Sequence, residues 1–166
     1  GLEYGRDPFE VVVPVFTRQD MGQSTPMATA QNTLTLVFAV SVEISSNVVS
    51  VVTVTGLNGA EVIDGIATTG GSSIAVVVLN GAVSTDGIFC DLDGRSDRGS
   101  WTENGGSPSL TMQLCANQTT VLVSGTVLTL SFDVQNPVAD QKSPDVQVAG
   151  SGPLFGIPAV SVVASG

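Results

Sequence analysis

The residues of this chain that are best suited to chemistry lie between its two cysteines. Three aspartates follow the first cysteine at short intervals: Asp91, Asp93 and Asp97. Aspartates spaced in this way around a turn can wrap Ca²⁺, which takes several hard oxygen ligands. Glu103 lies 12 residues after Asp91, close to where an EF-hand loop supplies its bidentate acid. The spacing makes this segment a candidate calcium loop.

Two features weaken the calcium interpretation. The turn glycine, Gly94, is the fourth residue of the segment, whereas an EF-hand loop has its glycine at the sixth. Arg95 and Arg98 bring positive charge into the same segment, and no helical sequence flanks it. The alternative is a solvated turn whose arginines neutralise its own aspartates. The three aspartates are therefore weak metal candidates, and we expect no bound metal and no cofactor.

Histidine is absent from the chain, which excludes whole classes of active site. Without it there is no Ser-His-Asp or Cys-His nucleophile and no histidine-based zinc or iron site. A pair of carboxylates would still suffice to hydrolyse a glycoside. The acidic residues, however, fall mostly at polar strand positions and in loops, as solubilising charge does. The sequence predicts that the protein is not an enzyme.

Cys90 and Cys115 are the only cysteines, and we expect them to form a disulfide. A single lysine, many serines and threonines, and one N-glycosylation sequon at Asn117 favour an extracellular or cell-surface location. Two free buried cysteines are the alternative. The sequence has no C-x-x-C pair that would indicate a zinc or redox site.

The net charge of −10 comes from 15 acidic and 5 basic residues. Nucleic-acid phosphates and anionic lipid headgroups would repel such a chain, so we expect neither as a partner. No run of about 18 apolar residues is present, and we expect no insertion into a membrane.

The elements that position these residues are predicted to be strands throughout. Valine is the most frequent residue, and stiff β-branched side chains favour sheets over helices. Apolar and polar residues alternate in residues 33–42, 109–114 and 126–135, which is typical of strands with one face in water. Less regular apolar runs complete the set, at residues 11–16, 48–55, 60–66, 74–79, 145–149 and 159–164.

This pattern predicts an all-β fold, an antiparallel β-sandwich of roughly nine or ten strands, with a barrel as the alternative. Residues 1–166 form one domain in this interpretation. Two segments interrupt the rhythm: a polar connection at residues 17–32 and a glycine-rich loop at residues 91–107. Trp101, within the second, is expected to cover one end of the sandwich.

The two ends of the chain resemble each other. Residues 8–16 and 153–161 place an aromatic residue, an apolar run and a proline in nearly the same order. The similarity suggests a tandem array: residues 1–17 are an N-terminal strand that pairs with a neighbour, 18–150 are the core, and 151–166 start the next repeat. The assembly residues of this hypothesis are Phe9, Val11, Val13, Val15, Val160 and Val162. The alternative is that both segments pair within their own domain.

Three motifs stand out along the chain: GQSTP followed by NTLTL in residues 22–36, VTVTGLNG in residues 52–59, and LSFDVQNP followed by SPDV in residues 130–146. They resemble tandem Ig-like repeat modules of large secreted or surface proteins of microbial eukaryotes, notably algae. The resemblance implies an Ig-like sandwich that serves as structural material of cell-surface coats and filaments. It implies no catalytic residues.

Three prolines extend the resemblance. Pro26, Pro108 and Pro144 stand in Ser-Pro or Thr-Pro dipeptides similar to those that carry hydroxyproline-linked sugars in algal wall proteins. A plain turn proline is the alternative at each position. We expect covalent glycans at Asn117 and, with less support from the sequence, at these prolines.

Together these observations predict a structural repeat unit of an extracellular filament or cell-surface coat. Its partners are further copies or tandem neighbours, joined head to tail through terminal β-strands. The alternative is a loop-based adhesion module that binds glycan or protein, with or without calcium. A carbohydrate-active enzyme, which would need a cleft with paired carboxylates, comes third.

Overall fold

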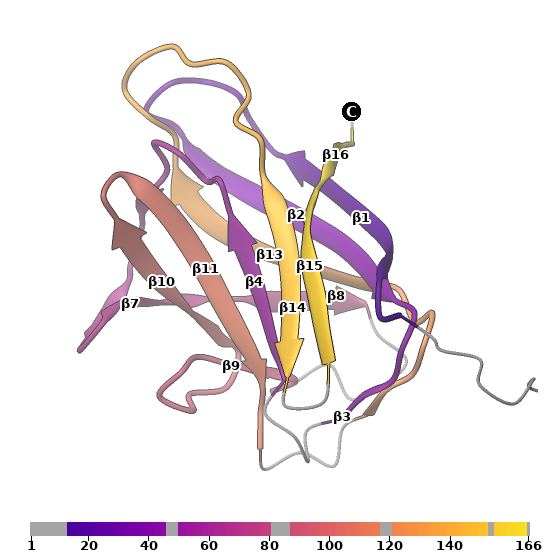
Figure 1. The fold of residues 1–166 in the computed structure, drawn as a ribbon. Coiled ribbons are helices and arrows are strands. Elements are labelled where there is room, and N and C mark those ends of the chain that lie inside the picture. The colour runs from indigo at the N-terminus through magenta and orange to yellow at the C-terminus, as the bar shows by residue number, and fades with distance from the viewer. Residues whose placement is uncertain (1–12, 46–49, 81–86, 117–120, 153–154, 166) are drawn as a thin grey trace, which may run out of the picture.

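The computed structural model describes residues 13–45, 50–80, 87–116, 121–152 and 155–165. All the secondary-structure elements assigned in these ranges are β-strands (Figure 1). They are β1 (Phe16–Gln23), β2 (Gln31–Val40), β3 (Ile44–Ser45), β4 (Val51–Thr55), β5 (Glu61–Val62), β6 (Ile66–Thr68), β7 (Gly71–Ala75), β8 (Val77–Asn80), β9 (Phe89–Cys90), β10 (Arg98–Asn104), β11 (Ser107–Leu114), β12 (Val121–Leu122), β13 (Leu128–Gln135), β14 (Gln147–Gly152), β15 (Phe155–Ser161) and β16 (Val163–Ala164).

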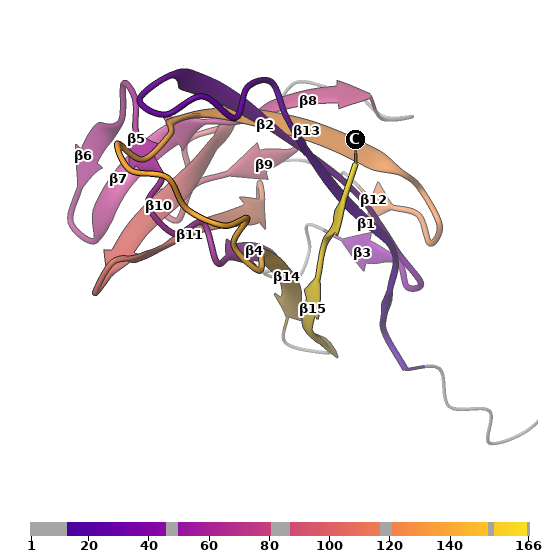
Figure 2. The ribbon, with the colours of Figure 1, turned by 90° about the horizontal axis from the view of Figure 1, so that it is seen from above.

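The strands form two large sheets and one small one. The six-stranded sheet has the order β16-β1-β2-β13-β5, and β8 also pairs with β13. The eight-stranded sheet has the order β15-β14-β4-β11-β10-β7-β6, and β9 also pairs with β11. Strands β12 and β3 form a separate pair. Seen from above, the two large sheets form two layers (Figure 2), so the all-β prediction is confirmed and the layering is that of a β-sandwich.

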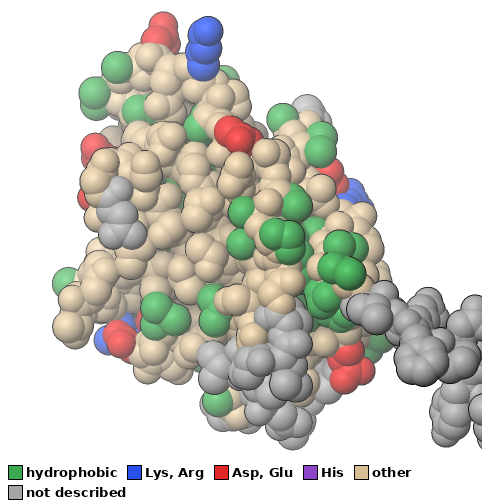
Figure 3. All heavy atoms as spheres, in the orientation of Figure 1, with side chains coloured by type: hydrophobic (Ala, Val, Ile, Leu, Met, Phe, Trp, Pro, Cys, Tyr) green, Lys and Arg blue, Asp and Glu red, His purple; other side chains and the backbone are tan. Residues whose placement is uncertain are grey.

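Charged and hydrophobic side chains cover only part of the face drawn in Figure 3. On the face drawn in Figure 3, acidic side chains are scattered, whereas hydrophobic side chains gather on the side where β15 and β1 lie. Two valines near β1 illustrate this exposure: Val13 is 64% exposed and Val163 is 61% exposed. The uneven distribution sets this side of the molecule apart from the rest of the face.

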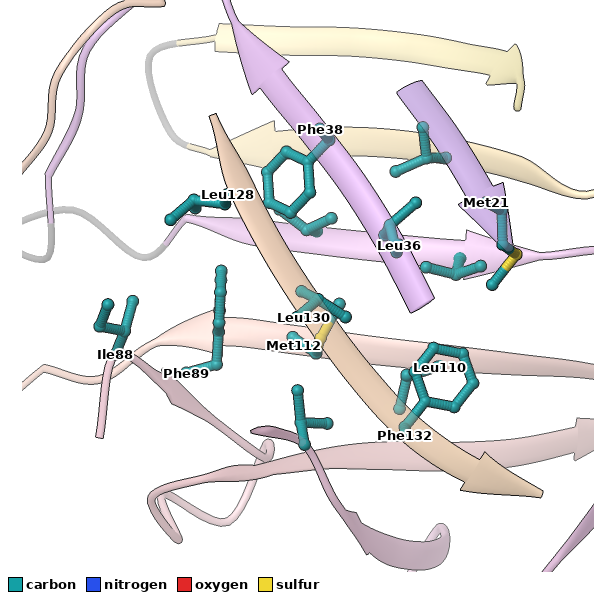
Figure 4. Close-up of a cluster of buried hydrophobic side chains, with 14 of the residues drawn as sticks. Met21, Leu36, Phe38, Ile88, Phe89, Leu110, Met112, Leu128, Leu130 and Phe132 are labelled. Carbon is teal, nitrogen blue, oxygen red and sulfur yellow. The ribbon is translucent and has the colours of Figure 1, made fainter. Parts of the chain in front are cut away.

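The core lies between the two large sheets, and the alternation that predicts its residues is confirmed. The inward residues of β13 are at most 2% exposed: Leu128, Leu130, Phe132 and Val134. Strand β11 contributes Leu110, Met112 and Leu114 in the same alternating way. The ring centroid of Phe38 lies 6.1 Å from that of Phe16 and 6.5 Å from that of Phe89. Figure 4 shows Phe38 and Phe89 among the buried side chains. Side chains from both layers therefore close one apolar cluster.

The prediction of a polar connection at residues 17–32 is wrong for residues 17–23, which form a strand. Strand β1 runs through this segment and pairs antiparallel with β2, from Phe16 opposite Val40 to Gln23 opposite Leu34. Phe16 and Met21 are its only buried residues. They reach the same face, although they are five residues apart, because a bulge after Phe16 inserts one extra residue. Because β1 has only two buried residues and a bulge between them, its sequence shows no alternation of apolar and polar residues.

The loop expected at residues 91–107 is also partly wrong. Strand β10 occupies its second half and pairs with both β7 and β11. Trp101 lies in this strand and is 1% exposed, so it is a core residue and does not cover an end. The strand count also exceeds nine or ten, because several predicted runs divide into shorter strands.

At two places, consecutive strands that are separated by a single residue belong to different sheets. The run at residues 74–79 divides at Val76, whose N–H donates to the Asp97 carbonyl oxygen at 3.0 Å, so that β7 and β8 belong to different sheets. Near the C-terminus, β15 pairs with β14, and β16 pairs with β1 in the other sheet. Val160 and Val162 pack against the core here. These two proposed assembly residues therefore have partners within their own chain.

Candidate functional site

A cleft of about 440 Å³ opens at one end of the sandwich. We call this the distal end, because β1 and β13 end here and β2 and β14 begin here; the proximal end is where β1 begins. The C-terminus also lies at the distal end (Figure 1). The volume falls within the range of about 300–1,000 Å³ that is usual for ligand sites.

The lining of the cleft is largely apolar in its deeper part. Seven apolar residues from six segments contribute: Met21, Leu34, Leu57, Ala60, Val134, Val146 and Val162. All of them are buried or packed against the core. Because the core fixes these side chains, the cleft offers a shaped apolar surface whose position does not depend on loops alone.

One wall of the cleft is fixed by two asparagines. Asn32 is 1% exposed, and its side-chain oxygen accepts the N–H groups of Ser24 at 3.1 Å and Thr25 at 3.2 Å. Its amide nitrogen donates to the side-chain oxygen of Asn136 at 2.8 Å, and Asn136 in turn donates to the carbonyl oxygens of Thr25 and Met27. These bonds tie the β1–β2 loop to the end of β13.

The opposite wall is the β13–β14 loop, which packs against the turn at residues 56–59. The Gln141 amide nitrogen donates to the Asn58 carbonyl oxygen at 2.8 Å. Gly56 has a φ of 79°, and a Cβ there would lie 2.2 Å from the Asp145 carbonyl oxygen, so only glycine fits. Lys142 is exposed on the rim of this wall. The cleft thus combines an apolar base with a polar rim, which suits binding of a short apolar segment.

The second feature is the turn after Cys90, where Asp91 is buried and fully engaged. One of its oxygens accepts the N–H groups of Asp93 at 3.0 Å and Arg95 at 2.9 Å. The other accepts the Ser73 hydroxyl and lies 3.4 Å from the Arg95 guanidinium. The Arg98 guanidinium donates to the Ser73 hydroxyl oxygen at 2.7 Å. The carboxylate therefore organises the turn and links it to β7.

These contacts decide the charge state of Asp91. Burial raises the pKa of the carboxyl, but the hydrogen bonds from Ser73, Arg95 and Asp93 and the charge of Arg95 outweigh it and hold the pKa below its usual value. The ionised form is therefore the one that the fold stabilises.

The three aspartates of the candidate calcium loop do not converge. Asp91 is occupied as described, the Asp93 side chain is 49% exposed, and Asp97 accepts the N–H of Gly87 at 2.7 Å. Glu103 lies in β10 opposite Pro108. Within the described residues, no three acidic, histidine or cysteine side chains are grouped closely enough to hold a metal ion.

The disulfide between Cys90 and Cys115 is present, as predicted. Their Cα atoms lie 5.1 Å apart, and both residues are buried. Strand β9 pairs with β11, which places Cys90 beside the end of β11. The bond therefore closes the segment that contains the Asp91 turn and strand β10.

The glycosylation candidates differ in accessibility. Asn117 lies outside the described residues. Pro26 is exposed and Pro144 is half-buried, and both line the distal cleft. Pro108 is buried within β11, which leaves no space for a sugar on its ring, so this position does not suit the modification proposed for it.

Sequence reasoning missed Asn32 and Ser73, although one of them left a signal. Asn32 is in phase with Leu34 and Leu36, so it occupies an inward position of β2. A polar residue on the apolar face of a strand indicates a buried hydrogen-bond network. Ser73 shows no such signal, because its partner Asp91 is distant in the sequence.

No protein-family model matches the chain, and no curated protein is similar to it in sequence. Fold and site together define the class: an all-β protein of two packed sheets with a buried disulfide and a cleft at one end. Within the described residues there is no helix of the length and hydropathy needed to cross a membrane.

Proposed function

We propose that the protein is a structural repeat unit of an extracellular filament or cell-surface coat, in which Ig-like sandwiches join end to end through their terminal segments. The observation that carries the proposal is the relative direction of the first and last described strands. Strand β16 pairs parallel with β1, with Asp20 opposite Val163 and Met21 opposite Ala164.

Parallel pairing has a direct consequence for assembly. The chain reaches the sandwich at the proximal end and leaves it at the distal end (Figure 1). From Val15 through β1 to Met21 the extended chain covers about 20 Å at about 3.3 Å per residue. Units linked in this way stack along a line, which is the arrangement that a filament needs. Contact between two different ends is heterologous and continues indefinitely where the rotation does not close a ring.

The segment that precedes β1 is suited to a contact with another molecule. Val13 is 64% exposed and Val15 is 43% exposed, although the Val15 backbone is held by Ser41 through two hydrogen bonds. Isolated exposed valines need no partner, but these continue an apolar stretch that includes Phe9 and Val11. An exposed apolar stretch of this length is usually covered by a partner.

Two further properties are consistent with an extracellular location. The disulfide persists in oxidising compartments and is rare in reducing ones. The net charge of −10 keeps a densely packed coat protein hydrated and opposes nonspecific aggregation. Neither property depends on a catalytic group.

One observation favours the alternative function, a loop-based adhesion module. The distal cleft lies between loops and has the size of a ligand site. In that case the purified chain would bind a soluble glycan or peptide and would not self-associate. The Asp91 turn does not support a calcium-dependent version, because its aspartates have other partners.

Sedimentation velocity of the full chain over a wide concentration range tests the proposal. End-to-end association is expected to raise the weight-average sedimentation coefficient with concentration and to raise the frictional ratio at the same time, because the particles lengthen. A single monomeric species at every concentration would contradict the proposal. Compact dimers with an unchanged frictional ratio would contradict the end-to-end arrangement.

A further inference from the structure

Val13 and Val15, the exposed valines that precede β1, lie at the opposite end of the molecule from the distal cleft. Val15 is fixed at the proximal end by its bonds to Ser41, whereas the cleft is lined by Met21 and residues beyond it on β1. A donor segment at one end and an acceptor cleft at the other make a unit that is complementary to a second copy of itself.

We infer that the distal cleft is the receptor for residues 9–13 of a second copy of this chain. The inference rests on the proposed end-to-end assembly and names the two surfaces that would make it. The donor side chains are Phe9, Val11 and Val13, which share one side of the segment when it binds as an extended strand, because side chains alternate. Their apolar side chains enter the apolar part of the cleft, while Glu10 faces the rim.

The segment cannot fill the cleft of its own molecule. Reaching it would require the chain to reverse direction near Val13–Val15. The four residue-to-residue steps from Phe9 to Val13 then span at most about 14 Å. The extended chain from Val15 through β1 to Met21 is about 20 Å long. An apolar segment of this length is therefore presented to a different copy.

The cleft also offers a backbone edge. Strand β16 is the outermost strand of the six-stranded sheet, so one side of it has no neighbouring strand among the described residues. Val162, Ala164 and Ser165, at and beside this edge, line the cleft. An incoming strand can hydrogen-bond to such an edge while its alternate side chains fill a pocket, which is how strand addition gives both affinity and selectivity.

Charge predicts an unusual salt dependence. Each copy carries −10, so approach of two copies is opposed by repulsion. Added salt screens that repulsion and leaves apolar burial in place. Association through the cleft is therefore expected to strengthen as salt is raised, whereas a contact made by opposite charges would weaken.

The test uses two full-length variants and their mixture. Val11→Asp places a charge in the donor segment, and Ala139→Trp places a large side chain at an exposed position on the cleft wall. Ala67→Trp is the matched control, since Ala67 is exposed on β6 at the other edge of the eight-stranded sheet. Circular dichroism and thermal unfolding verify that all three fold.

Each of the first two variants alone is expected to weaken self-association at least tenfold, and Ala67→Trp to leave it unchanged. Mixing Val11→Asp with Ala139→Trp is expected to restore association, but only to dimers, because each pair then has one working donor and one working cleft. A synthetic peptide of residues 6–15 is expected to block association of the unmodified chain, which provides a readout that needs no variant.

The outcomes distinguish the inference about the cleft from the proposed end-to-end assembly. If the unmodified chain associates and Ala139→Trp or the peptide leaves it unaffected, the cleft has another occupant, and the inference is overturned while end-to-end assembly stands. If the mixture forms no dimers, the pairing of segment and cleft is likewise refuted. If the unmodified chain never associates, the proposed function itself fails.

Discussion

Reduction of the Cys90–Cys115 disulfide is expected to lower the free energy of unfolding by about 3.5 kcal/mol. The two cysteines are 25 residues apart in sequence, so the bond removes loop-closure entropy from the unfolded chain. The enclosed segment holds β10 with Trp101, which is part of the core. The bond therefore restricts, in the unfolded chain, the segment that supplies an interior strand of the eight-stranded sheet.

Denaturant titration of the oxidised chain and of the Cys90→Ala/Cys115→Ala double variant measures this effect. The double variant avoids leaving a reactive thiol. A loss of less than about 1 kcal/mol would contradict the expectation. Mass spectrometry of native protein provides an independent check, because two free thiols there would remove both the stabilisation and the main support for an oxidising location.

Replacement of Asp91 by alanine is expected to cost about 3 kcal/mol. The substitution leaves buried donors without their acceptor, namely the Ser73 hydroxyl and the N–H groups of Asp93 and Arg95. Hydrogen bonds to a charged group are worth about 1.5–3 kcal/mol each in stability measurements, and the effects overlap because the donors share one carboxylate. Asp93→Ala is the control, because the Asp93 side chain is half exposed and its pair with Arg95 is a surface pair worth at most about 1 kcal/mol. Equal effects of the two substitutions would contradict this account of the turn.

Asp91 also predicts the direction of the acid response. Its pKa is lower in the folded chain than in the unfolded chain. At pH values between these two pKa values, the unfolded state therefore binds more protons than the folded state. The stabilisation is fully present above the unfolded pKa, about 3.9, and is lost as the pH falls through the folded pKa. Asp91→Asn is expected to flatten this part of the stability curve when unfolding is measured at a series of acidic pH values. An unchanged acid slope in the variant would show that other groups control it.

The sequence predicts those strands whose two faces differ. In β13, apolar and polar residues alternate because one face meets the core and the other meets water, so period two is visible. In β1, both faces are largely polar, and a bulge displaces the second buried residue, so the signal is lost. The run at residues 74–79 is apolar on both sides of Val76, and periodicity does not reveal that the chain changes sheets there.

The candidate site, like the fold, can be predicted only in part from the sequence. The pairing of Cys90 with Cys115 follows from an even count in a chain with extracellular composition. The cleft could not be predicted, because its apolar lining comes from separate segments that only the sheet order brings together. The spacing of the three aspartates indicates a candidate calcium loop, but the backbone of the turn directs them to different partners.

End-to-end assembly is tested most directly by electron microscopy of native material that contains the protein. The account predicts thin filaments or ordered coats with an axial repeat of one sandwich. That repeat is at least about 33 Å, the length of the ten-residue strand β2 at about 3.3 Å per residue. Native protein found only as separate single particles, with no axial repeat of this size, would contradict it.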